Sequence, residues 1–173
     1  ETFLAIISHM GGFGGSPVRD GYACLSFPYN TATIPAEVTE ADTTLIYLNK
    51  ELQPDSAGPG LQRGGFGQSV EIVVPDDDHA PQGFITSSIR GSNRDPDSSY
   101  PIFGREGGAY GRGNHLSIND EKVPHGGTYK LEHGAVLRFS LPGGGGFGDP
   151  FERDPDKVRD DVRSGLVSPD SAR

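Results

Sequence analysis

Alternating apolar and polar residues near the end of the chain predict a β-strand over residues 135–141. Its odd positions are apolar: Ala135, Leu137, Phe139 and Leu141. Arg138 and Ser140 fall on the opposite face. Side chains alternate between the two faces of a strand, so the odd face should lie in the core and the even face outside it. Residues 143–146, four consecutive glycines, follow this strand after Pro142.

Similar short runs, rich in β-branched and aromatic residues, predict further strands at residues 22–27, 44–52, 70–74, 84–89, 115–119 and 128–131. We expect residues 44–52 to form a central strand. Polar, glycine-rich segments separate these runs, and no helical pattern lies between them. The predicted fold is therefore mainly β: an antiparallel sandwich or barrel-like domain with long glycine-rich loops.

One short C-terminal helix is predicted after Asp154, which can cap it and is followed by a proline suited to the first turn. Val158 and Val162 share a face at i, i+4, and Gly165 stands where a helix commonly ends. We expect the valines and Leu166 to dock on a sheet edge while the charged side of the helix stays in solvent. The chain thus divides into a β-rich domain, residues 1–150, and a helical tail, residues 151–173.

Composition narrows the class of protein. The 173 residues suit one domain, and the formal net charge of −9 argues against a nucleic-acid partner, which needs clustered Lys and Arg. No apolar run approaches the length of a membrane span, and the single cysteine, Cys24, fits a reducing compartment, so we expect a cytoplasmic protein. Because the chain opens directly on a strand-like run without an initiator methionine, we expect a fragment or a small subunit.

The glycine-rich segments are the candidate functional elements. Gly-Gly-Phe-Gly occurs three times, at residues 11–14, 64–67 and 145–148. Glycines offer positive φ, exposed N–H groups and close approach by another chain or ligand. These segments are either turns pinned by a core phenylalanine or loops that converge on a cleft. The candidate substrate or interface residues are Arg63, Gly143, Gly144, Gly145, Gly146 and Asp149, with Asp149 as an N–H acceptor or ligand.

Other motifs with known chemistry lack the surrounding residues or elements that their function needs. Residues 143–148 match the dinucleotide-binding glycine pattern as letters, but no helix opens on the last glycine, so we expect no cofactor-binding residues in the chain. Residues 93–104 lack the glycine and glutamate of a calcium loop. Four histidines show no metal-ligand spacing, so a metal site and the catalytic residues stay open: His9, His115, His125 and His133. Residues 76–79 (Asp-Asp-Asp-His) could supply oxygen and imidazole ligands, but a run of acids directly after a strand favours a solvated turn.

Three glycine-dense segments, occurring in order, carry a resemblance to a known family. They are residues 54–68 (PDSAGPGLQRGGFGQ), residues 141–150 (LPGGGGFGDP), and residues 153–155 (RDP) with Val158 and residues 161–169 (DVRSGLVSP). Together with Asn30 and the stretch at residues 34–37, they resemble the C-terminal part of the hydantoinase B / 5-oxoprolinase family.

This resemblance implies an ATP-dependent complex in which ATP and Mg²⁺ are held by a hydantoinase A-type subunit. The B-type subunit then helps to open a cyclic amide such as 5-oxoproline or a hydantoin; a related ATP-dependent ketone carboxylase is the alternative. Such a complex is a hetero-oligomer, and a divalent metal in it is compatible with this chemistry. The family's long upstream region is missing here, so we expect no cofactor in this chain and no catalysis by it alone. A non-catalytic β module for assembly is the alternative from another class.

Overall fold

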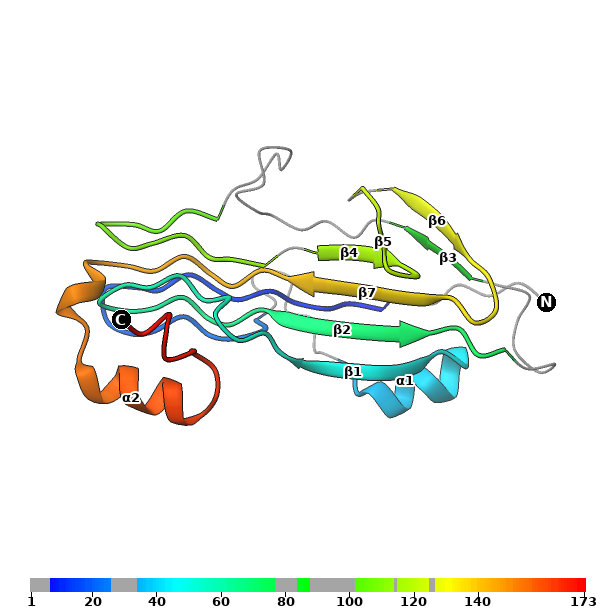
Figure 1. The fold of residues 1–173 in the computed structure, drawn as a ribbon, viewed down its shortest axis with the longest axis horizontal. Helices are drawn as coiled ribbons and strands as arrows, with labels where there is room; N and C mark the ends of the chain where they lie inside the picture. Colours follow the sequence, from blue (N-terminus) through cyan, green and yellow to red (C-terminus); the bar gives the residue numbers. More distant parts are fainter. Residues whose placement is uncertain (1–6, 26–33, 77–83, 88–101, 114, 125–126) are drawn as a thin grey trace.

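The computed structural model describes residues 7–25, 34–76, 84–87, 102–113, 115–124 and 127–173 (Figure 1). Two α-helices, one 3₁₀ turn and seven strands are assigned within them. In chain order they are α1 (Ala36–Thr43), β1 (Ile46–Leu52), β2 (Gln68–Val73), β3 (Phe84–Ser87), β4 (His115–Ile118), β5 (Glu121–Lys122), β6 (Thr128–Leu131), β7 (Val136–Leu141), η1 (Pro150–Glu152) and α2 (Pro155–Arg163).

Five of these strands form one antiparallel sheet in the order β1-β2-β7-β4-β5, and β3 pairs with β6 in a second, two-stranded sheet. Residues 44–52 were expected to form a central strand, and this was wrong, because β1 lies at the edge of the described sheet. Its outer side is partly covered by α1, where the Glu40 carboxylate accepts a hydrogen bond from the backbone N–H of Tyr47 at 2.8 Å. This contact satisfies a donor that an edge strand would otherwise expose.

The core lies on the odd face of β7, as the alternation predicted. The four odd residues are only 4 to 7% exposed: Ala135, Leu137, Phe139 and Leu141. They pack with Val70 and Ile72 of β2 and with Leu116 of β4. Leu131 of β6 joins the same core, so the small sheet packs against the large one. The mainly β, antiparallel fold is thus confirmed as sandwich-like, and the sheet does not close into a barrel.

Residues 22–27 and 36–43 differ from expectation. A strand was predicted at residues 22–27, but residues 22–25 form a turn, in which Cys24 has φ +50°, and the rest lie outside the described residues. Helix α1 was not predicted, because it buries Thr39 and Thr43 and leaves Val38 48% exposed. A helix that places its polar residues inward has no amphipathic pattern to detect.

Helix α2 follows the predicted signals. The Asp154 carboxylate accepts a hydrogen bond from the backbone N–H of Asp156, and Gly165 has φ +71°. Val158 and Val162 are only half-buried, so they form no deep apolar contact. Its charged side is exposed and carries two i, i+3 ion pairs, Arg159–Asp156 and Arg163–Asp160. No helix within the described part of the chain has the length and apolar character required to cross a bilayer.

Candidate functional site

The predicted glycine loops are extended segments that lie side by side. Three out-and-back excursions, residues 11–22, 56–67 and 102–112, surround the single segment 142–148; we call these four segments the glycine bundle. Each is continuous with a strand or lies beside one, so the bundle extends the large sheet toward the end of the molecule where α2 lies (Figure 1).

The central segment touches a different excursion at each successive glycine. A Cβ atom added to any of its four glycines would lie 2.0 to 2.2 Å from a backbone oxygen: that of Ser56 for Gly143, Phe13 for Gly144, Phe103 for Gly145 and Pro59 for Gly146. Gly143 and Gly146 therefore face the same excursion, three residues apart. This three-residue period matches a polyproline II helix, which has three residues per turn. Real side chains do not fit at such distances, so close approach of backbones explains the glycines.

Backbone hydrogen bonds hold the glycine bundle together. Three N–H groups of the central segment donate at 2.9 Å: Gly143 to Arg112, Gly144 to Gly65 and Gly146 to Ala109. Its carbonyls accept in return at 2.8 to 2.9 Å: Gly144 from Gly58, Gly145 from Gly15 and Gly146 from Arg105. The expectation of positive φ and exposed N–H groups at residues 143–146 was therefore wrong for these bonded glycines, and positive φ within the segment begins at Gly148.

Neither interpretation of the repeated tetrapeptide describes its geometry. Phe66 is 2% exposed and belongs to the interior, whereas Phe13 is 42% exposed. The three copies lie along extended segments rather than at turns. They converge on one another through backbone contacts, as between Gly64 and the carbonyl oxygen of Gly144, where an added Cβ would lie at 1.9 Å. Backbones in close contact therefore occupy the space between those segments.

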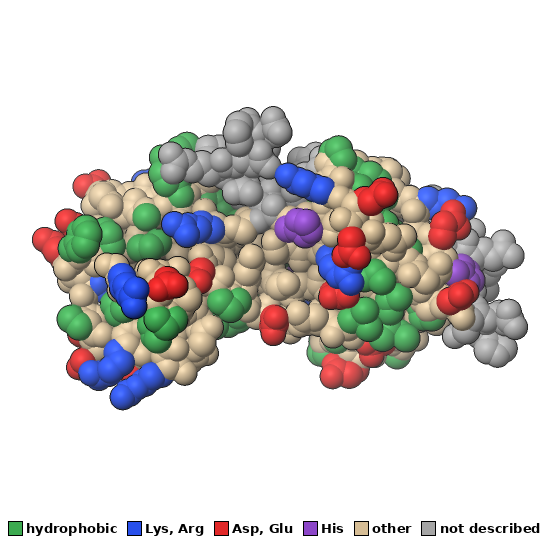
Figure 2. Space-filling model, in the orientation of Figure 1, with side chains coloured by type: hydrophobic (Ala, Val, Ile, Leu, Met, Phe, Trp, Pro, Cys, Tyr) green, Lys and Arg blue, Asp and Glu red, His purple; other side chains and the backbone are tan. Residues whose placement is uncertain are grey.

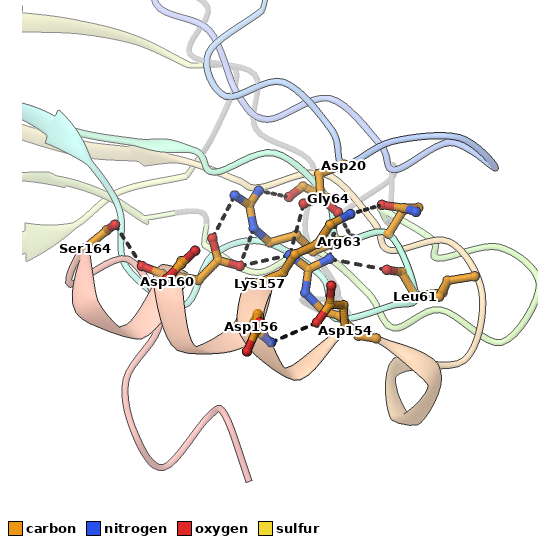
Figure 3. A network of polar contacts seen from close by, with 12 residues as sticks. Asp20, Leu61, Arg63, Gly64, Asp154, Asp156, Lys157, Asp160 and Ser164 are labelled. Carbon is orange, nitrogen blue, oxygen red and sulfur yellow. Dashed lines mark hydrogen bonds and ion pairs between the residues drawn. The ribbon is translucent and has the colours of Figure 1, made fainter.

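Arg63 lies at the surface of the bundle and binds α2. Its Nε and Nη2 donate to the two carboxylate oxygens of Asp161 at 2.9 and 3.0 Å (Figure 3). Its guanidinium carbon lies 4.3 Å from the centroid of the Phe66 ring. Arg153 extends this network, because it donates to Asp161 at 3.0 Å and to Asp20 at 2.7 and 2.9 Å.

Two arginines and two aspartates thus balance in charge, and they join the first excursion (Asp20), the second excursion (Arg63), the link between η1 and α2 (Arg153) and α2 itself (Asp161). Burial opposes ionisation of Asp20, but the hydrogen bond and charge of Arg153, together with the charge of Arg63, outweigh it and hold the pKa of Asp20 below its usual range. For Arg153, whose side chain is 7% exposed, burial alone would lower the pKa, but Asp20 and Asp161 raise it. Asp20 and Arg153 therefore stay ionised, and the network anchors the C-terminal segment.

Asp149 begins the 3₁₀ turn that follows the central segment. Its Oδ1 accepts a hydrogen bond from the backbone N–H of Phe151 at 2.9 Å. The structure thus brings the predicted residues into one region, Arg63 on its outside and the four glycines within it. A substrate or interface role for any of them stays a prediction.

The outer face of the large sheet holds a shallow concavity of about 220 Å³ that sequence reasoning missed. Its polar lining consists of Gln53, Ser69, Glu71, His115, Arg138 and Ser140. Arg138 pairs with Glu71 at 2.7 Å, and the Ser140 hydroxyl accepts the backbone N–H of His115 at 3.0 Å. Figure 2 looks onto this side, where basic and acidic side chains adjoin over the strands. In the sequence, only the polar residues at even positions of β7 pointed to this concavity. Its other lining residues are brought beside them by the pairing of β7 with β2 and β4, which the sequence does not reveal.

His9 lies on the opposite, core side of the sheet. Its Nδ1 is 3.2 Å from Gln68 Oε1, and its Nε2 is 3.2 Å from the Tyr47 hydroxyl. Burial lowers the pKa of His9 to about 4, so the imidazole is neutral at pH 7. Burial also raises the pKa values of Tyr47 and of the Cys24 thiol. These groups are hydrogen-bonded and uncharged, which suits a packing role.

Metal ligands do not gather in the part of the chain that the structure describes: no three His, Cys, Asp or Glu side chains there are placed to hold an ion. Of the histidines without metal-ligand spacing, His125 lies outside the described residues, and so does the acidic run at residues 76–79 apart from Asp76.

Curated sequences and solved structures resemble the chain over most of its length. An uncharacterized protein of Methanocaldococcus jannaschii is 33% identical over 80% of this chain, and the B component of a putative D-/L-hydantoinase from Pseudomonas sp. is 28% identical over 94% of it. The crystal structure of the ATP-dependent caprolactamase from Pseudomonas jessenii covers 95% of the chain with a TM-score of 0.73 and 26% identity. A nucleotide-free acetone carboxylase covers 94% with a TM-score of 0.63 and 20% identity, which shows the fold alone.

The chain spans only 23 to 29% of the length of these proteins. A family model described as hydantoinase B/oxoprolinase matches residues 1–150. The chain therefore belongs to the hydantoinase B/oxoprolinase family.

Proposed function

We propose that the chain contributes to the B-type subunit of an ATP-dependent cyclic-amide hydrolase that acts with an A-type, ATP-binding subunit in the cytoplasm. The similarity to the ATP-dependent caprolactamase, 26% identity over 95% of the chain, carries this proposal. ATP and Mg²⁺ belong to the A-type partner. ATP supplies the driving force, and the complex must hold the activated amide and shield it from water.

Within this complex we assign the chain a supporting role. Gly143, Gly144 and Gly146 donate hydrogen bonds to neighbouring backbones, and residues 143–146, all glycine, have no side chains to contact a substrate. Arg63 is engaged by Asp161. These contacts support a rigid domain that positions the rest of the complex, with bond-breaking residues supplied by other parts of it. The division into a domain at residues 1–150 and a tail at residues 151–173 belongs to the same proposal.

A ketone carboxylase is the second candidate, favoured by the fold shared with acetone carboxylase. The two reactions differ in substrate and in product. In the test, the B-type subunit containing this chain is purified with its A-type partner, and release of phosphate is measured with 5-oxoproline, hydantoin or caprolactam, and separately with acetone and bicarbonate.

The proposal predicts phosphate release and a ring-opened acid, detected by mass spectrometry, with at least one cyclic amide. If ATP is turned over only with the ketone and bicarbonate, the hydrolase proposal is wrong and the ketone carboxylase takes its place. Substitution of Gly144 or Gly146 by valine separates support from catalysis: loss of assembly indicates a structural role, whereas lost turnover in an intact complex indicates a site. Gly14→Ala is the control, since its added Cβ would have its nearest neighbour at 3.7 Å.

A further inference from the structure

The two most exposed large apolar side chains of the described residues lie on the glycine bundle and the turn that follows it. Phe151 is 92% exposed and Val18 is 83% exposed. Single exposed apolar residues are ordinary on protein surfaces, but a phenylalanine that is almost wholly exposed offers much area for a partner to bury.

Both side chains sit on rigid turns. The turn around Val18 is closed by Ser16, whose backbone N–H and hydroxyl both donate to the Arg19 carbonyl, at 3.0 and 3.1 Å. Phe151 lies in η1, where Asp149 accepts its N–H at 2.9 Å. Fixed turns reduce the conformational entropy lost when such side chains bind.

A buried ion pair joins the two turns. Asp20, two residues after Val18, accepts hydrogen bonds from Arg153, two residues after Phe151, at 2.7 and 2.9 Å. Val18 and Phe151 therefore belong to one end of the glycine bundle, the end where α2 also lies (Figure 1). We call the surface formed by residues 16–19 and 149–154 the bundle tip.

The bundle tip is acidic around its phenylalanine. Asp149, Glu152 and Asp154 are all exposed within three residues of Phe151. Within residues 149–154 the one basic residue, Arg153, is buried and paired. Arg19, next to Val18, is exposed, and its guanidinium donates to the Tyr22 hydroxyl and lies over the Tyr22 ring. A surface with an apolar recess bordered by Lys or Arg would complement an apolar anchor ringed by carboxylates, which gives specificity and speeds encounter.

We propose that the bundle tip docks into such a basic-rimmed apolar recess on the polypeptide that makes up the remaining length of the B-type subunit. This inference rests on the proposed function. Most of the length of each relative lies outside the region matched by this chain, so a subunit of that type carries a large further surface next to this domain. Within one subunit the effective concentration of that surface is high, so a small patch suffices for docking.

Photo-cross-linking tests the inference in the complete subunit with its A-type partner. p-Benzoylphenylalanine replaces Phe151, the complex is irradiated, and cross-linked peptides are identified by mass spectrometry. The expected result is a cross-link from residue 151 to a Lys- or Arg-bordered apolar segment in the remaining part of the B-type subunit. Combined Asp149→Asn, Glu152→Gln and Asp154→Asn substitutions, which keep the capping oxygens, should lower its yield at least fivefold.

The same cross-linker at Val38, on α1 at the other end of the molecule, is the matched control and should not reach that segment. Cross-links from residue 151 only to the A-type subunit, only to a second copy of this chain, or to nothing would overturn the inference. Activity is measured separately. If the expected cross-link forms but the complex opens no cyclic amide, the proposed function alone is refuted. If the complex hydrolyses a cyclic amide but the cross-link does not form, the docking alone is refuted.

Discussion

The backbone packing of the glycine bundle predicts unequal effects for two substitutions within one tetrapeptide. A Cβ atom at Gly12 would lie 1.9 Å from the carbonyl oxygen of Gly65, whereas one at Gly14 would have its nearest neighbour at 3.7 Å. Neither glycine has positive φ, so steric contact is the difference between them. Because real Cβ contacts do not fall below 3.0 Å, alanine at residue 12 must push the segments apart by about an ångström.

Such a shift stretches three hydrogen bonds of 2.7 to 2.9 Å: Gly12 to Pro142, Gly65 to Phe13 and Gly144 to Gly65. At about 1 kcal/mol for each bond and about 1–3 kcal/mol for overpacking, Gly12→Ala should lower the free energy of unfolding by about 4–6 kcal/mol. A domain is stable by only about 5–15 kcal/mol, so much of its stability would be lost. Gly14→Ala should change it by less than about 0.5 kcal/mol, since alanine also restricts the unfolded chain.

Urea unfolding followed by circular dichroism measures both variants against the unsubstituted chain. The two alanines should separate clearly in their midpoints while their slopes stay alike. Free energies of unfolding within about 1 kcal/mol of each other would show that the segments yield easily, and the account of the glycines as a backbone contact surface would fail.

Three further predictions concern stability. The pKa of His9 is about 4 in the folded state and 6.5 in the unfolded state, so the unfolded state binds more protons below pH 6.5. The free energy of unfolding should therefore be highest above pH 6.5 and fall by about 3 kcal/mol as the pH drops through 4. His9→Gln should remove this component from unfolding curves measured at different pH values. Arg153→Met leaves Asp20 without its arginine partner and Asp161 paired with Arg63 alone, so it should lower the free energy of unfolding by about 3 kcal/mol. Proteolysis of the C-terminal segment should also become faster. Arg159→Ala removes only an exposed ion pair and should cost under about 0.5 kcal/mol; equal effects would contradict the anchoring role. At Gly165 an added Cβ atom would have no neighbour within 4 Å, but alanine would have to adopt φ +71°. Thermal denaturation of Gly165→Ala should therefore show a free energy of unfolding lower by about 1 kcal/mol. No loss would mean that the end of the helix rearranges.

The strands were predictable because their signal is local. Residues 135–141 alternate in apolar character, and the apolar residues that the alternation selected are buried, although Ser140, expected on the outer face, is also only 6% exposed. Helix α2 was predictable from Asp154, its following proline and Gly165 for the same reason. Local patterns do not fix the neighbours of a strand, and β1 was placed centrally although it lies at the edge.

The candidate site was harder to predict because glycine carries no directional signal. The string at residues 143–146 is equally compatible with turns and with extended chains, and the choice depends on segments as distant as residues 13 and 103. The role of Arg63 likewise depends on Asp161, 98 positions away. The sheet-face concavity requires the pairing of three strands, which no single stretch encodes.

Continuity between the glycine bundle and the large sheet constrains the order of folding. Glycine loses more backbone freedom on ordering than any other residue, and the glycine-rich segments bring few apolar side chains to the core, so they make poor nuclei. Residues 53–67 join β1 to β2, and residues 142–148 extend β7, so pairing of these strands brings the segments together before they bond. The transition state should therefore contain the sheet and its apolar face. The hydrogen bonds of the glycine bundle should form afterwards, first next to the strand ends and then farther from them.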